Sequence, residues 1–149
     1  MGVAMNENGV SPAEFAAIAG KYEANLVGWA ATVEQLRREQ TRIRELETET
    51  DYREAEISLT VEGKNSEERK AHLTLALRAD PAYQQWRRRA DDCKGEVVHL
   101  QDEIADYRDR LSLYKRQMDY CIAFLDYLPR PPRHRARKDK EVIANGSRA

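Results

Sequence analysis

Three histidines are the residues of this chain that could most simply bind a metal or relay a proton. No two of His72, His99 and His134 have the spacing that places two side chains on one face of a helix. His99 is expected on a solvated helix face, and His134 lies in a basic C-terminal segment. The sequence therefore predicts no metal site and no cofactor.

Neighbouring carboxylates are the other groups that could act as acid and base. Both Asp91–Asp92 and Asp102–Asp106 fall on the outer face of a predicted helix. Hydrated carboxylates keep ordinary pKa values there, whereas catalysis needs desolvation or close pairing in a cleft. The sequence also contains neither a glycine-rich phosphate loop nor a serine nucleophile motif. We therefore expect a protein that is not an enzyme.

The two cysteines, Cys93 and Cys121, have no histidine at metal-ligand spacing. Both fall on an apolar helix seam, where a thiol packs as a small hydrophobic group. We expect inert core cysteines, with an interchain disulfide or a redox role as the alternative.

The run Trp86-Arg87-Arg88-Arg89 could bind a nucleic acid. An aromatic ring can stack on a base while neighbouring guanidinium groups hold its phosphate. Alternatively, Trp86 fills the core of a helix pair, and the arginines flank it or meet acidic partners.

The C-terminal segment is a second basic candidate. Residues 127–149 carry a net charge of +5, whereas residues 1–126 carry −6. The segment has too few apolar residues to fold. The simplest function for its positive charge is to neutralise phosphates without regard to sequence. A solubilising end and a contact with an acidic protein surface are the alternatives. The candidate nucleic-acid-binding residues here are Arg130, Arg133, Arg135, Arg137, Lys138 and Lys140.

A heptad seam positions most of these groups. From residue 86 to residue 128, positions spaced alternately by four and three are apolar, which predicts a coiled-coil seam. The helix that carries it is expected from residue 81 to about residue 128, a length of roughly 70 Å. A helix of this length cannot bury its own stripe, so a second helix must lie along it. The seam residues are Trp86, Ala90, Cys93, Val97, Leu100, Ile104, Tyr107, Leu111, Tyr114, Met118, Cys121, Leu125 and Leu128.

Capping signals delimit the helices. Ser11-Pro12-Ala13-Glu14 predicts a capping box and a helix from residue 12, and Asn65 with Glu68 predicts the cap of a short helix that ends near Ala79. Asp80-Pro81 then starts the last helix. Between the first two helices, residues 57–61 alternate apolar and polar as a strand does, and Gly63 can take a positive φ where the chain reverses.

The first helix has a less regular seam. After Phe15, Ile18 and Tyr22 the apolar positions continue through residues that include Leu26, Trp29, Val33, Leu36 and Ile43. This register places Gln40, Glu47 and Thr50 at the seam, so a looser core is expected in the second half.

Charge patterns favour pairing within one chain. Self-pairing of the last helix brings basic flanks together, whereas the first helix offers many carboxylates between residues 39 and 56. The fold is therefore expected to be all-α, an elongated antiparallel helical hairpin with a short middle helix. Residues 1–11 are expected to be disordered, 12–128 to form the coiled-coil domain, and 129–149 to be a disordered basic tail.

Apolar residues off the seam predict association. The last helix widens its apolar face near its end, and two helices cannot cover it. We expect a homo-oligomer, most simply a dimer of hairpins, unless residues 15–22 fold over this face. The off-seam residues are Leu113, Tyr120, Ile122, Phe124 and Tyr127.

No run of about 20 apolar residues is present, and the N-terminus lacks the pattern of a signal peptide. A cytoplasmic protein that does not enter membranes is expected.

The segment Gly63-Lys64-Asn65-Ser66-Glu67-Glu68-Arg69-Lys70-Ala71 continues through Leu73, Leu77, Asp80 and Tyr83 into a helix rich in arginine and glutamate. Over residues 63–125 it resembles small coiled-coil proteins encoded beside recombination genes in tailed-phage genomes. The resemblance implies an accessory of single-strand annealing or single-strand binding in the host cytoplasm, and it makes Asn65 and Arg69 the first partner-binding residues to test.

Two functions are compatible with these patterns. The first is a non-enzymatic accessory of phage recombination or replication, which binds DNA or a single-strand-binding or annealing protein. The second is a structural adaptor that docks a protein through Tyr120, Phe124 and Tyr127.

Overall fold

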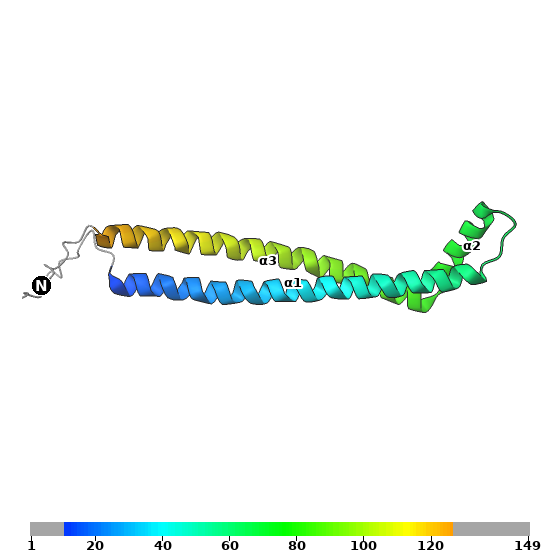
Figure 1. Ribbon diagram of the computed structural model, residues 1–149, viewed down its shortest axis with the longest axis horizontal. Coiled ribbons are helices and arrows are strands. Elements are labelled where there is room, and N and C mark those ends of the chain that lie inside the picture. The colour runs from blue at the N-terminus through cyan, green and yellow to red at the C-terminus, as the bar shows by residue number, and fades with distance from the viewer. Residues whose placement is uncertain (1–10, 127–149) are drawn as a thin grey trace, which may run out of the picture.

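A computed structural model describes residues 11–126, with side chains described to Phe124. The element order is α1 (Pro12–Thr60), α2 (Ser66–Ala79) and α3 (Pro81–Asp126). The prediction of an all-α fold is confirmed, and no strand occurs within these residues (Figure 1). The predicted disordered segments, 1–11 apart from Ser11 and 129–149, lie outside the described residues, as do Tyr127 and Leu128.

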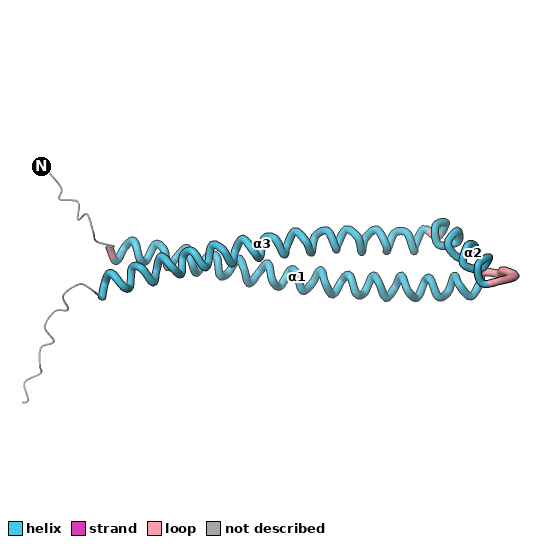
Figure 2. Tube along the Cα trace, turned by 90° about the horizontal axis from the view of Figure 1, so that it is seen from above, coloured by secondary structure: helices cyan, strands magenta, loops and turns pink. Residues whose placement is uncertain are grey.

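The long helices α1 and α3 lie side by side and antiparallel, and α2 lies at one end (Figures 1 and 2). They cross near α2 in one view and near the opposite end in the other, so they wind around each other. At 1.5 Å per residue α1 is about 74 Å long and α3 about 69 Å long. We call the end with residues 61–79 the tip, and the end where α1 begins and α3 finishes the open end.

The start of α1 follows the predicted capping box. The Ser11 N–H donates to Glu14 Oε2 at 3.1 Å, and the Glu14 N–H donates to Ser11 Oγ at 3.2 Å. Pro12 occupies the first helical position, where no N–H is needed.

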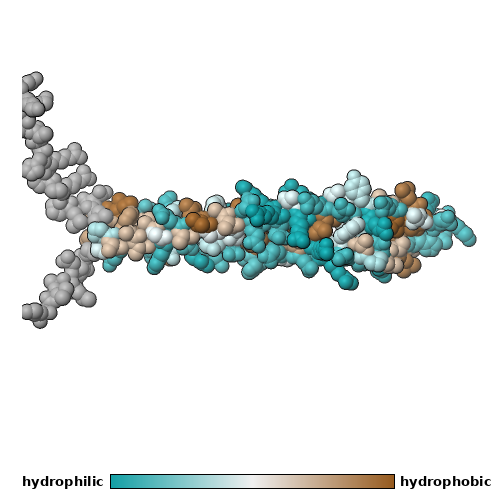
Figure 3. All heavy atoms as spheres, turned by 90° about the horizontal axis from the view of Figure 1, so that it is seen from below, coloured by the Kyte–Doolittle hydropathy of each residue, from teal (hydrophilic) through white to brown (hydrophobic). Residues whose placement is uncertain are grey.

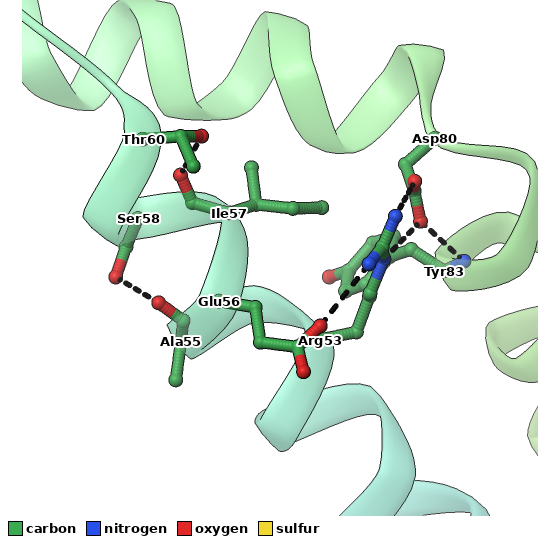
Figure 4. A network of polar contacts seen from close by, with 8 residues as sticks. All are labelled: Arg53, Ala55, Glu56, Ile57, Ser58, Thr60, Asp80 and Tyr83. Atoms are coloured by element: carbon green, nitrogen blue, oxygen red, sulfur yellow. Dashed lines mark hydrogen bonds and ion pairs between the residues drawn. The ribbon is translucent and has the colours of Figure 1, made fainter.

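The strand-like alternation at residues 57–61 is wrong as a prediction, because α1 continues through Thr60. Ser58 Oγ donates to the Ala55 carbonyl at 2.7 Å, and Thr60 Oγ1 donates to the Ile57 carbonyl at 2.8 Å (Figure 4). These local bonds are compatible with helix, and half-buried Ile57 continues the helical seam. The helix ends at Val61, whose backbone is extended.

The expected positive φ at Gly63 is also wrong, because no glycine of the described residues has one. A Cβ at position 63 would instead lie 2.7 Å from Arg69 Cγ and 2.8 Å from the Arg69 backbone nitrogen. Glycine is required here by the close approach of the first turn of α2 rather than by a left-handed backbone.

A charged contact ties the end of α1 to the start of α3. Arg53 donates through Nη2 and Nε to the two carboxylate oxygens of Asp80, at 2.7 and 3.0 Å. The same carboxylate accepts the Tyr83 N–H at 2.8 Å and so caps α3 (Figure 4). The guanidinium group of Arg53, followed by the Tyr83 N–H, lowers the pKa of Asp80, and the carboxylates of Asp80 and Glu56 raise the pKa of Arg53.

The predicted seam of α3 faces α1. Each seam residue from Trp86 to Cys121 is buried or half-buried, and Leu100 is the most buried, with 2% of its surface exposed. The fully buried seam residues lie mainly in the first half of the helix, whereas Tyr107, Leu111, Tyr114 and Met118 are only half-buried. The cover over α3 is therefore thinner between Tyr107 and Met118, and Cys121, which is 3% exposed, is covered again near the open end.

The predicted register of α1 is wrong after Tyr22. The structure continues the spacing of three and four that begins at Phe15. Asn25, Thr32, Glu39 and Leu46 therefore face α3 in place of Leu26, Val33, Gln40 and Glu47. Leu26 is 42% exposed and Glu47 lies at the surface. The buried or half-buried row is Phe15, Ile18, Tyr22, Asn25, Trp29, Thr32, Leu36, Glu39, Ile43, Leu46, Thr50, Arg53 and Ile57.

Candidate nucleic-acid and protein interfaces

The arginine run lies near the start of α3. Arg87, Arg88 and Arg89 are all exposed, and within the described part of the chain no carboxylate lies within 4.0 Å of their nitrogens. Successive residues of a helix point about 100° apart, so the three side chains fan around the surface of α3. They can contact phosphates from several directions, but they do not form a single flat patch.

Trp86 does not belong to that surface. Its side chain is half-buried at a seam position between α3 and α1. This placement fits the alternative in which Trp86 fills the helix pair. The half-buried ring leaves little surface for a base to stack on, so the arginines would act mainly through charge.

Carboxylates lie close to the arginine run. Arg89 shares a surface groove of about 260 Å³ with Arg42, and Glu39, Asp92 and Glu96 also line it. On the other side of the hairpin, Lys94 Nζ lies 2.9 Å from Glu47 Oε1, and the Glu47 carboxylate raises the pKa of Lys94. Charges of both signs therefore contribute to the electrostatic field around the run. Within it, Arg87 to Arg89 are the densest group of unpaired positive charges.

The arginine run and the last described residue of α3 lie at different ends of the hairpin. Arg89 is the ninth residue of α3, near the tip, whereas Asp126 ends α3 at the open end. The intervening 37 residues of helix span about 55 Å. The tail residues themselves, Arg130, Arg133, Arg135, Arg137, Lys138 and Lys140, lie outside the described residues.

The two residues suggested by the family resemblance shape the tip. Asn65 Oδ1 accepts the Glu68 N–H at 2.8 Å and caps α2. Arg69 packs against Gly63, and its Nε lies 3.5 Å from the Asn65 carbonyl. Both residues are exposed, but each also has this local structural role.

The cysteines and histidines form no reactive centre in the described residues. Cys93 and Cys121 are buried and unbonded. Burial, and then the hydrogen bond from its thiol to the Glu39 carboxylate, raises the pKa of Cys93. His72 Nδ1–H donates to the Glu62 carbonyl at 2.6 Å, and no group of three His, Cys, Asp or Glu side chains is placed to hold a metal.

The open end carries an apolar groove of about 620 Å³ between the first turns of α1 and the last turns of α3. Tyr120 forms part of its wall and is 68% exposed, and Phe124 is half-buried nearby in sequence. Figure 3 shows apolar surface beside the grey termini and again at the tip, with mostly hydrophilic surface between. The groove is lined by Glu14, Ala17, Ile18, Arg116, Gln117, Tyr120 and Cys121.

Sequence reasoning missed one surface. Leu26 and Val33 were assigned to the seam, but the register of α1 places them on its flank. The spacing that begins at Phe15 is compatible with this placement, but Leu26 and Val33 offer an apolar alternative that the sequence alone does not exclude.

No helix of the described residues is long and apolar enough to cross a bilayer. No protein-family model matches the chain, and no curated protein or solved structure shows significant similarity to it.

Proposed function

We propose that this protein is a non-enzymatic, nucleic-acid-associated accessory that acts in the cytoplasm in phage recombination or replication. The observation that carries the proposal is the run of three exposed guanidinium groups, Arg87 to Arg89, on a rigid helix and without carboxylate partners in the described chain. The resemblance over residues 63–125 supports the same function.

The binding mode follows from the groups available. Guanidinium groups bind phosphate oxygens and release counterions, which gives affinity without sequence readout. Because Trp86 is half-buried in the seam, base stacking on its ring contributes little to the affinity. The tail begins after Asp126, which lies about 55 Å along α3 from Arg89, and we propose that it contacts a separate stretch of the same strand or a second molecule.

The test is binding of a labelled single-stranded oligonucleotide across a salt series. The proteins to compare are the full chain, a chain that ends at Leu128, and a variant with Arg87, Arg88 and Arg89 changed to glutamine. We expect each altered protein to bind more weakly and with a shallower salt dependence.

A matched control has Arg37, Arg44 and Arg78 changed to glutamine. These side chains are exposed and lack a described carboxylate within 4.0 Å, but they are scattered along the rod. The net charge changes equally, so an equal loss of affinity would show a general charge effect rather than a site. Failure of the full chain to bind at low salt would remove the proposal.

A second function, a structural adaptor, is favoured by the apolar groove at the open end. Exposed Tyr120 on the groove wall is the kind of aromatic anchor that protein interfaces use. A single-strand-binding or annealing protein is the partner suggested by the resemblance. Calorimetric titration with such a protein should give binding that Tyr120→Ala weakens, while the arginine variant binds as the parent does.

We further propose that the working form is a dimer of hairpins. A two-helix rod leaves large apolar side chains uncovered, among them Leu113, Tyr120 and Ile122.

A further inference from the structure

A third apolar row runs along the first half of α1, beside the seam. Ala19, Leu26 and Val33 recur every seven residues. Each lies four residues after Phe15, Tyr22 or Trp29, so the three form a row next to that seam row on the helix surface. A helix that packs against one partner needs only the two seam rows, whereas a helix inside a bundle has a third. The start of α1 therefore has the pattern of a bundle helix.

An ion pair locates this row on one side of the hairpin. Glu47 lies two heptads after Val33, and it pairs across the hairpin with Lys94 at 2.9 Å. Ile122 lies four heptads after Lys94. Seven-residue steps stay on the same side of a supercoiled pair, so Ile122 lies on the same side as Leu26 and Val33. We call Ala19, Leu26, Val33 and Ile122 the outer row.

The outer row is open to solvent. Leu26 is 42% exposed and Ile122 is 47% exposed, while Ala19 and Val33 are half-buried. Toward the tip the same positions become polar, with Gln40 and then Glu47 on α1. The apolar face is thus confined to the half of the rod near the open end, where the seam of α3 is also the least covered.

The charges beside the outer row differ between the two helices. Beside the row on α1 lies the exposed carboxylate of Glu23, whereas Glu34 pairs with Arg38 of its own helix at 3.5 Å. On α3 the row itself continues into Lys115 and Arg108. One chain therefore presents an acidic residue on α1 and basic residues on α3 to whatever covers the row. Two copies related by a two-fold axis satisfy both kinds of charge at once, because α1 of each lies on α3 of the other.

We propose that the outer row is the self-association surface of this protein, and that it packs against the same row of a second copy to form a four-helix bundle at the open end. The inference rests on the proposed dimer of hairpins and names its surface and arrangement. With both open ends together, α1 of one subunit lies antiparallel on α3 of the other. The nucleic-acid proposal is independent of it.

Contacts within the hairpin show which residues of α1 and α3 lie at the same height along the rod. Gln117 shares the open-end groove with Ile18, and Tyr107 lies against Gly28. These two pairs place Lys115 at the level of Gly20, less than one helical turn from Glu23. In the proposed arrangement, Lys115 therefore faces Glu23 of the partner subunit.

The first experiment is sedimentation equilibrium of the full chain over a concentration series. The parent is expected to dimerise, and Leu26→Gln with Ile122→Gln should weaken dimerisation at least about tenfold. The matched control is Val98→Gln with Leu75→Gln, which alters two exposed apolar residues outside the row, and it should dimerise as the parent does. A monomeric parent at every concentration, or a row variant that dimerises unchanged, overturns the proposal.

The second experiment tests the arrangement by charge reversal. Lys115→Glu should weaken dimerisation, and adding Glu23→Lys should restore it, because the facing pair is reversed rather than removed. Circular dichroism of each variant checks that the hairpin remains helical. A double variant that stays as weak as Lys115→Glu overturns the placement of α1 on the α3 helix of the partner subunit. Neither result depends on oligonucleotide binding, which the arginine variants test separately.

Discussion

Gly28 on α1 lies directly against the ring of Tyr107 on α3. A Cβ atom at position 28 would come within 2.6 Å of the Tyr107 hydroxyl oxygen and 2.8 Å of two ring carbons. The absence of a side chain on α1 is therefore what lets the tyrosine pack in the seam.

Gly28→Ala should destabilise the hairpin even though alanine is the better helix former. Alanine gains about 1 kcal/mol of helix propensity in a helix interior, but overpacking costs typically about 1–3 kcal/mol. Gly20 is the control, because a Cβ there meets nothing within 4 Å. Gly20→Ala should raise the free energy of unfolding in urea by about 1 kcal/mol. Equal stabilisation by Gly28→Ala and Gly20→Ala would contradict the contact. Adding Tyr107→Leu to Gly28→Ala should reduce the loss of stability, because the clashing ring is removed.

The Asp80 contact predicts a pH dependence at the junction of α2 and α3. Because the guanidinium group of Arg53 lowers the pKa of Asp80 below its ordinary 3.8, the stabilisation is complete above that value and is lost as pH falls through the lowered pKa. The protection factors of the first amides of α3, which are exchange rates corrected for the pH dependence of intrinsic amide exchange, should therefore fall in acid for the parent. For Asp80→Asn they should be lower and nearly independent of pH in that range. Glu56→Gln alters the more exposed partner of Arg53 and should have the smaller effect.

The polar seam of α1 predicts that one substitution will stabilise the protein. Asn25 is half-buried at a seam position, and its Nδ2 donates only to the Lys21 carbonyl of the same helix, at 2.8 Å. The free energy of unfolding of Asn25→Leu should be about 1 kcal/mol higher than that of Asn25→Ala, as measured by thermal or urea unfolding. Leucine and alanine have similar helix propensity, so the difference reports the apolar surface that leucine buries. Equal stability of the two variants would place position 25 away from α3.

Local signals made the helix starts predictable. Ser11, Asn65 and Asp80 each accept a backbone N–H from three residues ahead, as their sequence patterns indicate. The seam of α3 was equally predictable, because it is apolar at each position and has no competing register.

The register of α1 was not predictable in the same way. Leu26 and Val33 offer an apolar alternative one position from Asn25 and Thr32, and local propensity does not separate the two. What distinguishes them is long-range contact, such as Tyr107 over Gly28 and the Cys93 thiol on Glu39. The candidate arginines could be placed on a flank from sequence, but their separation from the tail follows only from the length of α3.

Burial along α3 predicts a graded series of truncations. Leu100 is 2% exposed, Leu111 is half-buried, and Leu113 is 52% exposed. Leu100→Ala removes a buried side chain and should cost about 2–3 kcal/mol. Leu111→Ala should cost less than Leu100→Ala, since part of that side chain already contacts water.

Leu113→Ala is the control of this series and should change the stability of the hairpin by no more than about 0.5 kcal/mol. The three variants are compared by urea unfolding at one low protein concentration, because self-association at the open end adds to apparent stability. If Leu111→Ala cost as much as Leu100→Ala in that limit, α1 would cover the open half of α3 fully. The thinning of cover that motivates a second copy there would then be wrong.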